Sequence, residues 1–177
     1  DATLAAKELS KARAKVAKKM AGEAEKQLAD LGMAKAKLEA ELEPVPLGED
    51  PTAGELPSDG ADHLELILTA NPGEPPRPLR KVASGGELSR TLLALKTVLA
   101  AYDPVRTLVV FDEIDANVGG RLGDMLGRKL AALSDSHQVL CVTHLAQVAS
   151  FAGKQWSIRK TTTGKRTSTR SEEHTSE

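Results

Sequence analysis

The sequence is poor in aromatic residues, in cysteine and in long apolar runs. One Trp, one Tyr and two Phe make up 2% of the 177 residues, so a core of one ordinary domain must be aliphatic. Cys141 is the single cysteine, which excludes a disulfide within the chain and fits a reducing cytosol. No run approaches the roughly 18 apolar residues of a membrane span. With 24 basic and 25 acidic residues, overall charge alone does not hold the chain to DNA or to an anionic membrane.

The N-terminal 43 residues contain no proline and are built mostly from good helix formers. The chain opens on Asp1 without a Met or a signal-like segment, which indicates an internal piece of a longer protein. Leu9, Met20, Leu31 and Leu42 recur at steps of eleven, which places them on one narrow stripe of a helix. We expect residues 1–43 to form one helix and one strand of an antiparallel coiled coil. The alternative is a long helix that lies on a globular domain.

Residues 44–62 have a different composition. They contain four prolines, three glycines and five acidic residues, with no Lys or Arg. Proline and glycine interrupt regular structure, so this stretch is predicted to be a linker.

The remaining chain alternates between strand and helix patterns. Strands are predicted at 63–68, 107–111 and 138–144, and a helix at 88–102. Leucines at helical spacing between the second and third strands predict a βαβ unit in a buried parallel sheet. A short strand at 155–159 is predicted to close the fold.

Ser84-Gly85-Gly86-Glu87 directly precedes the predicted helix at 88–102. The two glycines let a ligand approach the backbone closely, and a helix N-terminus offers free N–H groups and partial positive charge. With the Ser84 hydroxyl these groups suit a phosphate. The alternative is a turn that only caps the helix.

Two further sets of polar residues follow the apolar strands. Asp112 and Glu113 follow the predicted strand at 107–111, at the edge of the sheet where parallel folds bind ligands. The first carboxylate is expected to order a magnesium ion and the second to polarise a water, unless both only cap a helix. Asp115 begins the loop that follows.

Thr143 and His144 end the neighbouring strand on the same edge, where the imidazole could reach a terminal phosphate. The alternative is a polar residue at a strand end. Cys141 is expected to be inert core.

Together these segments resemble known motifs in a known order. Ala83-Ser84-Gly85-Gly86-Glu87 resembles the signature of ABC-type ATPases, and Asp112-Glu113 ends a strand similar to their Walker B strand. Asp-Glu-Ile-Asp at 112–115 is closer to the RecN-type DNA repair ATPases, a branch of the SMC-like family. Further stretches that resemble the family are 71–75, 115–120 (the D-loop), 142–144 (the switch-histidine loop) and 143–149.

The resemblance implies an α/β fold: the C-terminal half of an ABC-type head, P-loop NTPase-like, with a mostly parallel sheet and flanking helices. Residues 63–160 would form this lobe, and 1–43 the returning strand of a coiled coil. The chain contains no Gly-x-x-x-x-Gly-Lys-Ser/Thr segment, so the P-loop and the Q-loop would lie on an N-terminal lobe. The chain would then carry half an active site and be inactive alone.

The resemblance also implies residue roles. Two heads would sandwich two ATP molecules, Asp112 would hold Mg²⁺ through water, Glu113 would position the attacking water, and His144 would contact the γ-phosphate. The signature (Ser84, Gly85, Gly86 and Glu87) would act on the partner head's nucleotide, and Asp115 would belong to the D-loop. The protein would repair DNA breaks in the cytoplasm, at the nucleoid.

Two other functions stay open: the nucleotide-binding domain of an ABC transporter, and a non-enzymatic coiled-coil scaffold. The transporter is disfavoured because it has no long helix before its signature.

The C-terminal segment, 161–177, is predicted to be a polar tail. Basic residues gather near it (Lys154, Arg159, Lys160, Lys165 and Arg166), and we interpret them as a solvated edge rather than a DNA contact. The last eight residues, 170–177, are interpreted as a translated sequencing adapter, the alternative being a natural polar tail.

Overall fold

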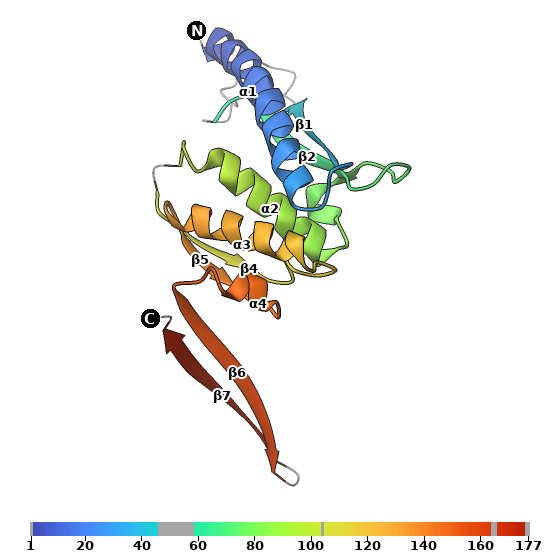
Figure 1. The fold of residues 1–177 in the computed structure, drawn as a ribbon. Coiled ribbons are helices and arrows are strands. Elements are labelled where there is room, and N and C mark those ends of the chain that lie inside the picture. The colour runs from blue at the N-terminus through green and yellow to red at the C-terminus, as the bar shows by residue number, and fades with distance from the viewer. Residues whose placement is uncertain (1, 46–58, 104, 164–165, 176–177) are drawn as a thin grey trace.

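The computed structural model describes residues 2–45, 59–103, 105–163 and 166–175 (Figure 1). Three separate sheets and four α-helices make up this part of the chain. In chain order the elements are α1 Ala2–Asp30, β1 Lys37–Pro44, β2 Asp62–Thr69, β3 Arg77–Pro78, η1 Leu79–Lys81, α2 Gly85–Leu99, β4 Leu108–Phe111, α3 Arg121–Ser134, β5 Gln138–Cys141, α4 Ala146–Ala149, β6 Lys154–Thr163 and β7 Arg166–Thr175.

Helix α1 is shorter than predicted. It ends at Asp30, and Gly32 follows with φ 79, a left-handed conformation that stops a helix. Residues 37–44 then form strand β1, so the prediction of one helix through residue 43 was wrong. The buried face of α1 packs on α2 and β1 and is formed mostly by small side chains, namely Ala6, Ala17, Ala21, Ala24 and Leu28. Of the predicted stripe, Met20 packs against the core, whereas Leu9 is exposed. The coiled coil stays a prediction.

Strands β1, β2 and β3 form an antiparallel sheet in that order. Leu38 pairs with Leu68, and both side chains are buried in the main core. The predicted strand at 63–68 is confirmed as the centre of β2. Most of the predicted linker, 46–58, lies outside the described residues.

The predicted βαβ unit is confirmed. Strands β4 and β5 pair in parallel, with Val109 opposite Val139, and α3 connects them. One side of this pair faces the aliphatic core through Val109 and Phe111, which are buried together with Leu126 and Leu130 of α3. The other side presents apolar side chains that are each at least half exposed: Leu108, Val110, Leu140 and Val142.

The C-terminal segment differs from its prediction. Strand β6 pairs with β7 in an antiparallel hairpin and not with the β4–β5 sheet, so the strand at 155–159 exists but does not close the fold. Most of the predicted polar tail belongs to this hairpin, which runs away from the helices at the end opposite α1 (Figure 1). The side chains of Trp156 and Ile158 are more than half exposed on it.

None of the helices within the described ranges is long and apolar enough to cross a membrane.

Candidate functional site

The SGGE segment (Ser84, Gly85, Gly86 and Glu87) begins helix α2. Ser84 is the N-cap, and its Oγ accepts a hydrogen bond from the Glu87 backbone N–H at 3.4 Å. Both glycines belong to the first turn of the helix, so the predicted helix start at residue 88 was three residues late. The first N–H groups of a helix have no partner within it and carry a partial positive charge. The segment therefore offers an anion the donors that the sequence analysis expected.

The two glycines lie where α2 meets the segment after β4. A Cβ on Gly85 would collide with Oε2 of Glu113. A Cβ on Gly86 would lie 3.0 Å from Cβ of Ala116 and 3.2 Å from the carbonyl oxygen of Glu113. The Glu113 carboxylate is the end of a flexible side chain and could move away from a Cβ at position 85, whereas a Cβ at position 86 would press on atoms close to the backbone. Gly86 therefore allows α2 to lie this close to the segment after β4.

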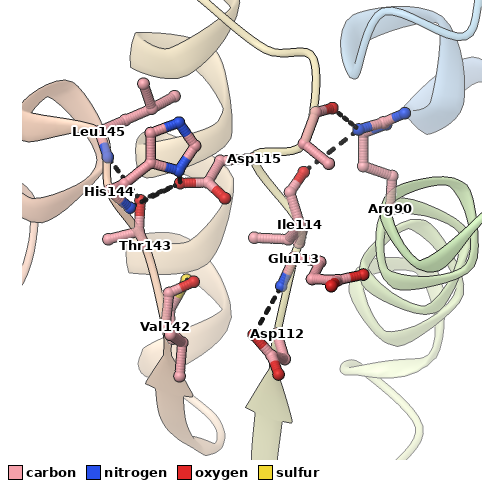
Figure 2. Close-up of polar contacts among 11 residues, drawn as sticks. Arg90, Asp112, Glu113, Ile114, Asp115, Val142, Thr143, His144 and Leu145 are labelled. Carbon is pink, nitrogen blue, oxygen red and sulfur yellow. Dashed lines mark hydrogen bonds and ion pairs between the residues drawn. The ribbon is translucent and has the colours of Figure 1, made fainter.

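Asp112 and Glu113 directly follow β4, as predicted, and both are exposed. Asp112 Oδ1 accepts a hydrogen bond from the Glu113 backbone N–H at 2.9 Å. Glu113 itself has φ 55, in the left-handed region that side-chain-bearing residues rarely adopt. Its side chain points toward α2 in Figure 2 and accepts no hydrogen bond from the described part of the chain. Such local strain is concentrated at functional sites.

Asp115 joins the ends of β4 and β5. Its carboxylate is 4% exposed, and Oδ2 accepts hydrogen bonds from the Thr143 hydroxyl and, at 2.9 Å, from the His144 backbone N–H (Figure 2). The same oxygen lies 3.1 Å from His144 Nδ1. Burial raises the pKa of Asp115, but the hydrogen bonds from Thr143 and His144 outweigh burial and hold this pKa below its ordinary value.

His144 therefore has one ring nitrogen occupied and one open. Its side chain is 73% exposed, with Nδ1 on Asp115, and Nε2 has no partner among the described residues. A carboxylate on one imidazole nitrogen sets the tautomer and directs the other nitrogen outward. The predicted site residues thus fall into two groups: the SGGE segment with Asp112 and Glu113, and Asp115 with His144. No hydrogen bond or ion pair links these two groups in the described ranges.

Cys141 is half-buried at the end of β5 and packs against the core, close to its prediction as an inert core residue. Burial, together with the charges of Asp115 and Asp112, raises the pKa of its thiol to about 11. A thiol with this pKa is almost fully protonated at neutral pH and is a poor nucleophile.

Sequence reasoning did not assign roles to Ser89, Arg90 or Thr143. Ser89 and Arg90 bond backbone carbonyls of the segment after β4, and Thr143 bonds Asp115. A signal was present for Arg90, because it lies one helical turn after Gly86 and so faces the same neighbour.

A divalent metal would find one ligand here. No group of three or more His, Cys, Asp or Glu side chains gathers in the part of the chain that the structure describes. Mg²⁺ keeps several waters and is bound by one or two carboxylates plus substrate phosphates. The exposed carboxylate of Asp112, at the end of a strand, fits one position in such a set, and the other ligands would come from outside this chain.

No protein-family model matches the chain. The chain is 44% identical to the DNA repair protein RecN of Streptomyces coelicolor over 167 residues, which cover 90% of this chain and 28% of that protein. It is 37% identical to the RecN of Bacillus subtilis over 178 residues, which cover 96% of this chain and 31% of that protein. The chain therefore spans less than a third of the length of these curated relatives.

A solved structure shares the fold. The Smc head domain of Pyrococcus furiosus, with an extended coiled coil and bound to the C-terminal domain of ScpA, superposes with a TM-score of 0.52. The superposition covers 86% of this chain and 34% of that one, at 20% identity.

The fold is thus that of a lobe of an SMC-like ATPase head, which confirms the predicted fold class. Within this class the chain belongs to the RecN branch, as the resemblance of its motifs predicted.

Proposed function

We propose that this chain is the C-terminal lobe of an ATP-hydrolysing head in a RecN-type protein that repairs DNA double-strand breaks. The observation that carries the proposal is that three features lie at one edge of the β4–β5 sheet. The SGGE segment touches Glu113, Asp112 ends β4, and Asp115 holds His144 at the end of β5. RecN relatives at 37–44% identity support the DNA repair role.

In this proposal Asp112 would hold Mg²⁺. When bound, the ion would neutralise phosphate charge and so ease cleavage of the terminal phosphoryl group. Glu113 would accept a hydrogen bond from the attacking water, since its carboxylate is exposed and has no other donor among the described residues. His144 would turn Nε2 toward the γ-phosphate while Asp115 holds Nδ1.

The SGGE segment would act on the nucleotide of a second head. Ser84, Gly85, Gly86 and Glu87 lie at the start of a 15-residue helix, whose free N–H groups and dipole attract phosphate. Binding of ATP by both heads would then close an ATP-sandwiched homodimer, and hydrolysis would open it.

The N-terminal lobe of the same protein would cover the exposed side of the β4–β5 pair. Parallel strands are normally buried on both faces. Here one face is covered by α3, whereas Leu108, Val110, Leu140 and Val142 are at least half exposed on the other. This lobe would also bring the P-loop.

The two other functions are weaker. A transporter domain has no counterpart to helix α1, and the relatives are DNA repair proteins. A non-enzymatic scaffold has no use for an exposed carboxylate at a strained φ beside a glycine-lined helix start. We assign no DNA contact to the basic residues of the hairpin. Lys154 forms an ion pair with Glu173, and Arg159 and Lys160 are exposed on β6.

The test is Glu113→Gln in the full-length protein, with Glu23→Gln on the exposed surface of α1 as the matched control. Glutamine keeps the shape of the side chain but cannot act as a base, so we expect hydrolysis to fall by about 10²–10⁴-fold while ATP binding persists. Turnover and calorimetric ATP titration measure the two quantities. Hydrolysis at the parent rate in Glu113→Gln would remove Glu113 from the mechanism, and a parent protein without ATPase activity would favour the scaffold.

A further inference from the structure

Helix α2 holds three alternate carbonyl groups of the segment 112–116. Ser89 Oγ donates to the carbonyl oxygen of Asp112 at 2.8 Å. Arg90 Nη1 donates to the carbonyl oxygens of Ile114 at 3.2 Å and Ala116 at 3.1 Å. In Figure 2 Arg90 lies on one side of this segment, and the Asp115 side chain points to the other side.

Two residues with positive φ flank the carbonyls that Arg90 bonds. Glu113 has φ 55 and Asn117 has φ 59, and both carry side chains. Each left-handed residue of this kind costs about 1–2 kcal/mol and persists only where its surroundings fix it. The carbonyls that Arg90 bonds lie between these two residues, so the guanidinium acts where the backbone needs support.

Arg90 is placed there at a cost. Its Nε is buried and has no acceptor among the described residues, and burial lowers the pKa of the guanidinium. An apolar side chain could pack in the same space without this penalty. Gly86 leaves room for the guanidinium, since a Cβ at that position would lie 3.2 Å from Arg90 Nη1. We therefore attribute the arginine at this position to the hydrogen bonds that it donates to the two carbonyl groups, and not to its packing.

We propose that Arg90 is a positioning residue for ATP hydrolysis, which holds the 112–116 segment so that Glu113 keeps its direction beside the SGGE segment. This inference rests on the proposed function. Arg90 touches neither nucleotide nor water in it; it acts through the backbone that carries Glu113. Because the same helix begins with the SGGE segment, Arg90 also fixes the spacing between the signature and the acidic pair of one head.

The experiment compares Arg90→Ala with Arg106→Ala in the full-length protein. Arg106 is a matched control, because its Nη2 also donates to two backbone carbonyls, those of Ser134 and Asp135, at the far end of α3. We expect Arg90→Ala to lower kcat on the order of 10- to 100-fold, with KM for ATP within about twofold, because small misplacement of a reacting group costs this much in rate. Arg106→Ala keeps the parent kcat.

Chemical rescue separates positioning from a loss of fold. Guanidinium chloride at a non-denaturing concentration can occupy the space that Arg90→Ala opens, and it is expected to restore part of kcat, whereas sodium chloride at the same ionic strength does not. If Arg90→Ala does not fold, Arg90→Lys replaces it. Lysine keeps the charge but lacks the planar fork, so it is expected to fold and to have a lower kcat.

The proposal is overturned if Arg90→Ala loses no more kcat than Arg106→Ala, if guanidinium gives no rescue of a folded Arg90→Ala, or if Arg90→Lys has the parent kcat. An inactive Glu113→Gln together with an unaffected Arg90→Ala rejects this inference alone. Parent-rate hydrolysis in Glu113→Gln removes Glu113 from the mechanism and this inference with it, whereas a parent protein without ATPase activity rejects the proposed function itself.

Discussion

Glu113 and Asp115 lie two residues apart on the same segment, yet their carboxylates have opposite surroundings. Asp115 is buried and accepts hydrogen bonds from Thr143 and His144. Glu113 is exposed, adopts a left-handed φ, and accepts no hydrogen bond from the described residues. One carboxylate is satisfied within the chain and the other is not.

This difference separates a structural role from a chemical one. Asp115 ties β5 to the segment after β4 and orients His144, so its charge is used within the fold. Glu113 gains nothing from its position that stabilises the fold, and the strained φ costs stability. Residues of this kind are retained for function, which is why Glu113 is the proposed catalytic group and Asp115 the residue that orients His144.

The largest expected effect on stability is that of Asp115→Ala. This change leaves the Thr143 hydroxyl and the His144 backbone N–H without their acceptor, which costs about 1–3 kcal/mol. Glu113→Ala, the matched change two residues away, is expected to alter the unfolding free energy by less than about 0.5 kcal/mol. Urea unfolding of both variants measures the contrast, and equal effects would contradict it.

The same contrast has a pH dependence. The pKa of Asp115 is lower in the folded chain than its ordinary value. Its contribution to stability is therefore complete above the unfolded pKa, near 4, and is lost as the pH falls through the lower folded pKa. Unfolding free energies measured through this acidic range are expected to fall less steeply in Asp115→Asn than in the parent. The same slope in both would show that Asp115 does not carry this dependence.

A smaller effect is expected for Glu113→Gly. Glycine adopts positive φ without steric strain, whereas alanine keeps the penalty. We expect Glu113→Gly to be more stable than Glu113→Ala by about 0.5–1 kcal/mol, while neither variant hydrolyses ATP in the full-length protein. Thermal unfolding and turnover check the two halves. A glycine variant less stable than the alanine variant would mean that the φ of Glu113 carries no strain.

The thiol of Cys141 responds to the charge of the nearby acids, Asp115 and Asp112. Its pKa of about 11 predicts alkylation at pH 8 roughly 100-fold slower than for an ordinary thiol. Asp112→Asn removes one negative charge and is expected to speed alkylation slightly, with Asp124→Asn on the exposed face of α3 as control. Mass spectrometry of iodoacetamide-treated protein gives the rates. Alkylation as fast as in a free peptide would contradict the raised pKa.

Local patterns predicted most of the fold near the site. The continuous apolar runs gave β4 and β5, and Ser-Gly-Gly-Glu marked the start of α2. The prediction of helix beyond residue 30 was wrong because the sequence pattern of residues 31–44 fits both a helix and a strand. Leu31 and Leu42 continue the stripe of a helix, but Lys37-Leu38-Glu39-Ala40-Glu41-Leu42-Glu43 also alternates with the period of a strand. Pairing with β2 stabilises the strand, and local sequence does not show this contact.

The site was less predictable than its elements. The sequence placed Asp112, Glu113 and His144 at strand ends, because residues after parallel strands meet at one edge. It did not predict that Asp115 is buried between Thr143 and His144, or that Arg90 bonds the carbonyls of Ile114 and Ala116. Both depend on how separate elements pack. The β6–β7 hairpin was missed for the same reason, since its pairing partner lay in a segment without an apolar pattern.

Mixing two inactive variants of the full-length protein tests whether the SGGE segment of one head acts on the nucleotide of another. Ser84→Arg blocks the approach of Gly85 and Gly86 to the partner's γ-phosphate, and a P-loop Lys variant cannot load its own nucleotide. Each alone is expected to lack ATP-dependent dimerisation and turnover. In a mixed dimer one composite site keeps an intact P-loop and an intact signature, so light scattering and turnover are expected to recover to about one working site per dimer. No recovery at any mixing ratio would contradict action in trans and would leave the SGGE segment as a helix cap.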